Sequence, residues 1–74
     1  MNQVICGNSD CEVDYALRKA SKRAVEDGCV IWVYDSFGMF YMTDAYPPQG
    51  SDVIARCLPG GRIELKRKRA NDGR

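Results

Sequence analysis

Residues 29–43, CVIWVYDSFGMFYMT, form the densest run of apolar, β-branched and aromatic residues in the chain. Residues of these types favour strands, whereas glycine and serine favour turns. Gly28 precedes the run and Ser36-Phe37-Gly38 interrupts it. The run therefore predicts a β-hairpin with strands at 29–35 and 39–43, joined by a short glycine-containing loop.

The two faces of this hairpin differ, because successive side chains of a strand point to opposite sides. Cys29, Ile31 and Val33 share one face of the first strand, and Trp32 and Tyr34 lie on the other. The face that carries Trp32 and Tyr34 has two interpretations. In the first, it is covered as part of the core, which we favour for Trp32 because a small domain needs its large hydrophobes. Alternatively, its aromatic residues form a platform for a partner, since Trp and Tyr combine contact area with a polar group; the candidates are Trp32, Tyr34 and Tyr41.

A second hairpin follows a loop at residues 44–51, where Pro47-Pro48 removes two backbone donors. Residues 52–58 and 62–68 read as strands, and Pro59-Gly60-Gly61 reads as the turn between them. The last strand alternates apolar with charged residues. We expect it at an edge of the sheet, where lysine discourages further pairing.

Residues 9–27 have the pattern of an amphipathic helix. Ser9 and Glu12 have the spacing of a capping box, in which each side chain bonds a free amide at the helix start. We therefore expect a helix from Asp10 to Asp27, ended by Gly28. Its apolar residues recur at helical spacing and form one stripe: Val13, Ala16, Leu17, Ala20 and Ala24.

The sequence thus predicts an α+β fold with one N-terminal helix packed on a small antiparallel sheet of about four strands, two consecutive β-hairpins. Asn2 to Cys6 is a candidate for a short extra N-terminal strand. We assign residues 1–69 to a single domain and residues 70–74 to a disordered basic tail. At 74 residues the chain is near the lower limit for an independent core, which leaves a homodimer open.

Composition limits the classes of function. The chain has 45% hydrophobic and 28% charged residues, which is typical of a globular protein, and its net charge of +1 gives no overall drive towards nucleic acid or a membrane. Histidine is absent, which removes the commonest general base and metal ligand. We expect no enzyme activity, no catalytic residues and no cofactor.

Met1 to Cys6 lacks the basic and apolar segments of a secretory signal, and no run is long enough to span a membrane. We therefore predict a cytoplasmic protein with no membrane partner. Its four cysteines are expected to be reduced in that compartment.

The cysteine spacing disfavours a zinc site, because it does not repeat a close pair. Cys29 and Cys57 fit small core residues of strands. Cys11 lies where the first turn of a helix is expected to stabilise a thiolate. Together with Cys6 it can form a redox-sensitive pair, and we predict no metal.

Two basic clusters stand out. The first lies on the predicted helix and reads either as a solvated face or as a surface for phosphates or an acidic protein; it comprises Arg18, Lys19, Lys22 and Arg23. The second lies near the C-terminus and can contact a phosphate backbone; it comprises Arg62, Lys66, Arg67, Lys68 and Arg69.

In size and order of elements the chain resembles many small accessory proteins of bacteriophages and mobile elements, which act by binding host proteins. The favoured function is a small non-enzymatic protein-binding module, a modulator or inhibitor of its partner, that uses the hairpin aromatics and the basic helix face. The alternative is a nucleic-acid-binding protein that uses the β-ribbon and the basic C-terminal cluster.

Overall fold

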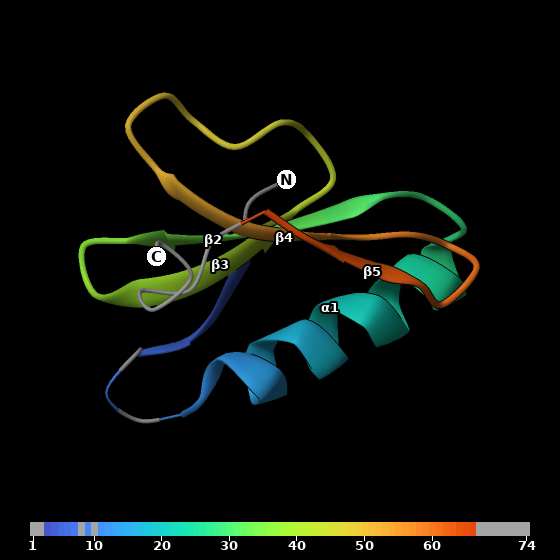
Figure 1. The fold of residues 1–74 in the computed structure, drawn as a ribbon, viewed down its shortest axis with the longest axis horizontal. Coiled ribbons are helices and arrows are strands. Elements are labelled where there is room, and N and C mark those ends of the chain that lie inside the picture. The colour runs from blue at the N-terminus through green and yellow to red at the C-terminus, as the bar shows by residue number, and fades with distance from the viewer. Residues whose placement is uncertain (1–2, 8, 10, 67–74) are drawn as a thin grey trace, which may run out of the picture.

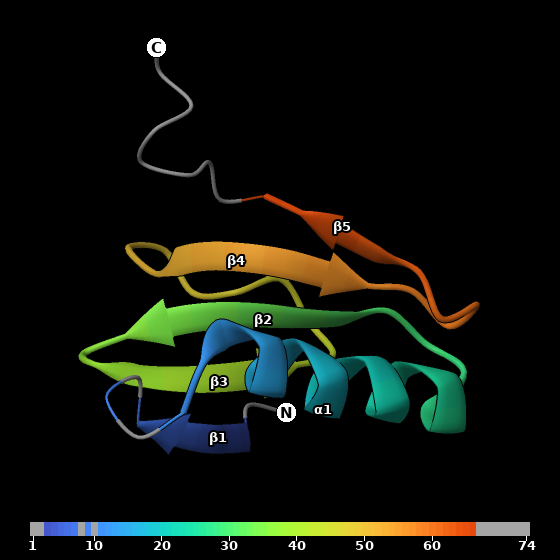
Figure 2. The ribbon, with the colours of Figure 1, turned by 60° about the horizontal axis from the view of Figure 1, so that its bottom comes forward.

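The computed structural model describes residues 3–7, 9 and 11–66. This part of the chain forms one helix and a five-stranded antiparallel sheet, an α+β fold (Figure 1). In chain order the elements are β1 (Gln3–Gly7), α1 (Val13–Asp27), β2 (Ile31–Ser36), β3 (Met39–Thr43), β4 (Asp52–Cys57) and β5 (Ile63–Leu65). The strand order β1-β3-β2-β4-β5 places β2 at the centre and leaves β1 and β5 at the edges (Figure 2).

The predicted fold class and both hairpins are confirmed, and the short N-terminal strand is present as β1. Pro59 occupies a tight turn in which the Gly61 amide donates to Leu58 O at 3.0 Å. The last strand lies at an edge, as expected, but it is shorter than predicted: β5 spans only Ile63–Leu65, and Arg62 and Lys66 lie outside it. The predicted strand residues 67–68 and the predicted tail at 70–74 lie outside the described residues.

The start of the helix differs from the prediction. Helix α1 begins at Val13, and Glu12 is its N-cap residue, with no side-chain capping bond. The predicted capping box of Ser9 and Glu12 is therefore wrong. Cys11 is held in the connection before the helix by a disulfide to Cys6 and by a hydrogen bond from its amide to Gly7 O, so the helix starts only after it.

The end of the helix is confirmed. Gly28 adopts a left-handed conformation with φ of 68°, which glycine tolerates without a steric penalty. The Gly28 and Cys29 amides both donate to Ala24 O. Within the described residues, no helix is long and apolar enough to cross a membrane.

The core lies between α1 and one face of the sheet (Figure 1). The predicted apolar stripe faces inward: Ala16, Ala20 and Ala24 are fully buried. Their small side chains let the helix approach the sheet closely, and the large residues come from the strands. The strand residues in this core are Ile31, Val33, Phe40, Met42, Ile54, Ala55 and Cys57.

The turn between β2 and β3 has an unusual residue at its tip. Ser36 pairs with Met39, so the loop has two residues, Phe37 and Gly38, and both have positive φ, 51° and 77°. This is the pattern of a type I′ turn, where Asn-Gly is the preferred pair. A left-handed conformation costs a bulky L-residue about 1–2 kcal/mol, and Phe37 recovers none of it by burial because its side chain is 100% exposed.

We expect Phe37→Asn to stabilise the protein. Asparagine tolerates the left-handed conformation better than phenylalanine, and no packing is lost, so the free energy of unfolding should rise by about 1 kcal/mol. Urea denaturation of the two proteins measures the difference. A variant less stable than the wild type would contradict the assigned turn.

A second prediction concerns the buried thiol of Cys57. Burial raises its pKa from 9.0 to about 11. The folded state therefore holds this proton more tightly than the unfolded state, and the associated stability, present in full below pH 9, is lost as the pH rises from 9 to 11. In denaturation curves across this range, Cys57→Ala should be less stable throughout but should lose less stability with pH than the wild type. Equal losses would contradict the prediction.

Candidate functional site

The face of the sheet opposite α1 carries aromatic side chains that contact one another, and the loop at 44–51 arches above this face (Figure 1). Trp32 lies half-buried on this face. The Tyr46 ring meets it edge-on, with centroids 4.9 Å apart, and the Arg56 guanidinium lies 5.6 Å from its centroid. Trp32 is thus held by neighbours on two sides, outside the core that packs against the helix.

Arg56 is itself fixed by an ion pair from the neighbouring strand. Its guanidinium donates to the carboxylate of Glu64, the residue paired with it across β4 and β5. This hydrogen bond lowers the pKa of Glu64. The Arg56–Glu64 ion pair thus fixes the guanidinium that contacts Trp32.

Tyr34 and Tyr41 form a second aromatic pair on the same face. They are directly opposite each other on β2 and β3, and their rings stack with centroids 5.1 Å apart and planes inclined by 8°. Tyr34 is only 2% exposed. Its burial, with a further contribution from Tyr41, raises the pKa of the Tyr34 hydroxyl.

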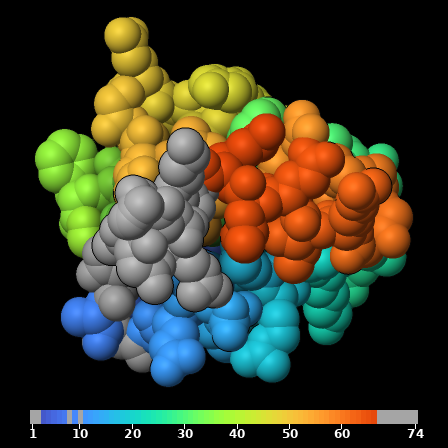
Figure 3. All heavy atoms as spheres, viewed as in Figure 1, coloured from blue at the N-terminus to red at the C-terminus, as the bar shows by residue number. Residues whose placement is uncertain are grey.

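A groove of about 560 Å³ lies between this stack, the β2–β3 turn and the loop at 44–51. We call it the aromatic groove. Figure 3 shows the hairpin tip (light green) and the loop (yellow) as separate projections from one side of the molecule. The lining residues are Tyr34, Asp35, Ser36, Phe37, Tyr41, Pro48, Gln49, Gly50, Ser51 and Asp52.

A second groove, of about 490 Å³, lies between α1 and β1. We call it the basic groove. Lys19 Nζ lies 5.6 Å from the centroid of Tyr15. Arg23 donates to Gln3 Oε1 at 3.1 Å and to Asp27 Oδ2 at 3.2 Å, which ties the helix to the edge strand. The lining residues are Gln3, Val4, Ile5, Tyr15, Lys19, Lys22, Arg23, Glu26 and Met42.

The structure distributes the predicted partner-binding residues over both grooves. Tyr34 and Tyr41 line the aromatic groove, whereas Trp32 does not. Three of the four basic helix residues line the basic groove; Arg18 is exposed outside it. Phe37 was not among the predicted site residues; a phenylalanine beside the glycine of a hairpin loop, where asparagine is preferred, is the signal that could have found it.

The candidate nucleic-acid residues are only partly described. Arg62 directly precedes β5 and Lys66 directly follows it, and both residues are exposed. The remaining three, Arg67, Lys68 and Arg69, lie outside the described residues.

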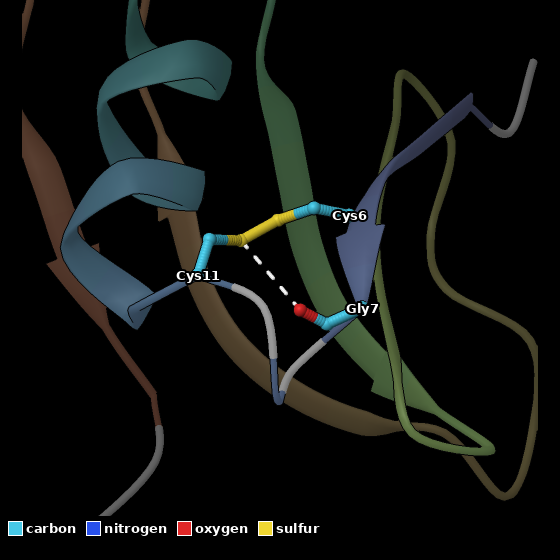
Figure 4. Close-up of a disulfide and its surroundings, with 3 residues drawn as sticks. All are labelled: Cys6, Gly7 and Cys11. Carbon is cyan, nitrogen blue, oxygen red and sulfur yellow. Dashed lines mark hydrogen bonds between the residues drawn. A yellow bond between two sulfur atoms is a disulfide. The ribbon is translucent and has the colours of Figure 1, made fainter.

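The cysteines divide into a linked pair and two free thiols. Cys6 in β1 and Cys11 before α1 form a disulfide, with Cα atoms 6.6 Å apart, and Cys11 Sγ lies 3.7 Å from Gly7 O (Figure 4). The expectation that all four cysteines are reduced is therefore wrong for this pair. Cys11 also lies outside the helix rather than in its first turn.

Of the free thiols, Cys57 is a core residue, as predicted, and its thiol points to Leu17 O at 3.8 Å. Cys29 is half-buried against the core but precedes β2 instead of lying in it. Among the described residues, no three His, Cys, Asp or Glu side chains gather into a group that could hold a metal ion.

No protein family model, curated protein or solved structure matches this chain. Its function is therefore inferred from the two grooves and the hairpin tip.

We expect reduction of the Cys6–Cys11 disulfide to lower the free energy of unfolding by about 2 kcal/mol, because the bond restricts a short loop of the unfolded chain. Urea denaturation with and without dithiothreitol measures the loss. Cys6→Ser combined with Cys11→Ser is the control and should be insensitive to the reductant. A wild type equally insensitive would contradict the pairing.

Proposed function

We propose that the protein is a small non-enzymatic protein-binding module of the cytoplasm that modulates or inhibits its partner, in the manner of accessory proteins of bacteriophages and mobile elements. One observation carries the proposal. Phe37, the residue at the tip of the β2–β3 hairpin, is fully exposed and has a backbone conformation that phenylalanine disfavours. A residue that lowers stability and buries nothing in the free protein is accounted for by burial in a complex.

The surroundings of Phe37 support this role. A large aromatic anchor that enters an apolar pocket of a partner is typical of an interface hot spot. In the Tyr34–Tyr41 stack beside it, Tyr34 is already buried and each ring packs on the other, which limits the side-chain entropy lost on binding. Pro48 extends the apolar lining on the far side of the groove. A partner segment that contacts the tip can therefore also fill the aromatic groove.

The shape of the tip supports an inhibitory role. The two-residue turn makes the hairpin end narrow, and its only large side chain is Phe37. Such a projection fits a concave apolar site of the partner, where it excludes that site's own ligand. The aromatic groove can also accept a second copy of this chain, in which case a homodimer would form.

The aromatic groove favours a protein over a nucleic acid. None of the described residues that line it is a lysine or an arginine, whereas binding of a phosphate backbone relies on such cations. The net charge of +1 adds no general attraction to nucleic acid. In a reducing cytoplasm the Cys6–Cys11 disulfide would be exposed to reduction; Cys6 directly follows Ile5, which lines the basic groove.

Phe37→Asn should remove partner binding while it stabilises the fold. We expect a tagged wild-type protein to capture a partner from the source cell, and the variant to lose at least about 2 kcal/mol of binding free energy, the size of an interface hot spot. Pull-down followed by titration with the purified partner measures both.

Val25→Asn is the control, because Val25 is 52% exposed on α1 and lines neither groove. It should bind as the wild type does. Equal capture by Phe37→Asn, or capture that nuclease treatment abolishes, would refute the proposal; sedimentation of the purified protein as a dimer that Phe37→Asn dissociates would identify a second copy as the partner.

A further inference from the structure

The basic groove is separate from the surface proposed above and has features of its own. It runs along three consecutive residues of the edge strand β1, Gln3 to Ile5, and is overlooked by one side of α1. Lys19, Lys22 and Arg23 give this side a positive charge, against which Glu26 is the only acidic residue of the lining. Lys22 has no hydrogen-bond or ion-pair partner among the described residues.

Strand β1 is an edge at which another strand can add. It pairs with β3 on one side and is the last strand of the sheet on the other. Its sequence, QVICG, contains no charge and no proline, the residues that most often protect an edge from further pairing; its one irregularity is a shift of register with β3 between Val4 and Cys6. The opposite edge, β5, has only three residues and is flanked by Arg62 and Lys66. Of the two edges, β1 is the less protected.

The two faces of β1 would give an added strand different environments. On the helix face lie the cationic side chains of α1. On the other face lies Val4, 48% exposed and paired with Tyr41. Because side chains of a strand alternate between faces, an added strand fits best when acidic residues alternate with apolar ones. The acidic residues would meet the lysines and the apolar ones would cover Val4.

The same lysines argue against a second copy of this chain. Antiparallel pairing of two β1 strands places both helices on one face of the joined sheet, on either side of the two-fold axis. Lys19, Lys22 and Arg23 of one copy would then face the same residues of the other, with Glu26 as the one acidic residue of each lining and none in β1. Like charges at close range disfavour this dimer and leave an acidic strand as the matching occupant.

We propose that the basic groove is a docking site for an extended segment of a protein partner, which adds to β1 as a sixth strand and places an acidic residue at every second position towards Lys19 and Lys22. Backbone hydrogen bonds to the edge supply affinity, and the charges supply the choice of sequence. Arg23 is held in place by Gln3 and Asp27 and keeps donors for a carboxylate.

The probe is a short fluorescent peptide in which valine and glutamate alternate, titrated with the whole protein and followed by anisotropy. We expect binding that weakens with salt, and at least about tenfold weaker binding of the same peptide with glutamine in place of glutamate. In spectra of the ¹⁵N-labelled protein, the amides of β1 should shift and those of β5 should not.

A matched pair of double variants locates the site. Lys19→Glu with Lys22→Glu should weaken binding at least about tenfold. Arg62→Glu with Lys66→Glu carries the same change of net charge at the opposite edge and should leave binding within about twofold. Thermal melts of both variants verify the fold. Both variants should still capture the partner that binds through Phe37, so a failure of this inference is distinguishable from a failure of the proposed function.

Several outcomes would overturn the proposal. They are equal affinity for the glutamate and glutamine peptides, shifts at β5 instead of β1, and equal losses in the two double variants. Tighter binding of single-stranded DNA than of the peptide, lost in Lys19→Glu with Lys22→Glu, would reassign the groove to nucleic acid. Sedimentation of the wild type as a dimer whose interface involves β1 would reassign it to a second copy.

Discussion

The contact between the alanine-lined side of α1 and the central strand β2 is the interaction on which the rest of the structure depends. Ala16, Ala20 and Ala24 are fully buried against the sheet, where Ile31 and Val33 supply the apolar volume. The arrangement suits a chain of 74 residues, since small helix residues shorten the distance to the sheet and the strands provide the hydrophobic area. A single helix, however, covers only one face of a five-stranded sheet.

The second face is therefore covered by means other than a second layer. Tyr46 and Arg56 pack on Trp32, and Tyr34 stacks on Tyr41. Each of these side chains combines an apolar part with a polar group, so the face can stay partly exposed without the penalty of an exposed aliphatic surface. The same property makes them suitable for contact with another protein. Self-coverage and partner recognition are in this way two uses of one set of residues.

Local signals explain what could be predicted from the sequence. The hairpin around Phe37 follows from β-forming residues on either side of a glycine turn, and the end of α1 follows from Gly28. The start of α1 could not be predicted, because it depends on a disulfide between Cys6 and Cys11, and spacing alone did not settle that pairing. The pairing of β1 with β3 was likewise beyond reach, since strand order is set by tertiary packing.

The candidate site was predictable in residue type and not in arrangement. Alternation placed Tyr34 on the face that the helix leaves open, and helical spacing grouped Lys19 with Lys22 and Arg23. Which of these residues share a groove depends on the loop at 44–51 and on β1, whose positions the sequence does not encode locally. Phe37 was overlooked because a turn residue is normally judged by its backbone and not by what its side chain can bind.

The position of β1 has a consequence for the order of folding. Strands β2 and β3 are joined by two residues, whereas residue 3 of β1 pairs with residue 42 of β3. Contacts distant in sequence form late, because the chain between them must first be ordered. We expect β1 to dock last and to open first under native conditions. The groove beside it then exists only in molecules whose folding is complete, and a ligand of that groove would distinguish finished chains from unfinished ones.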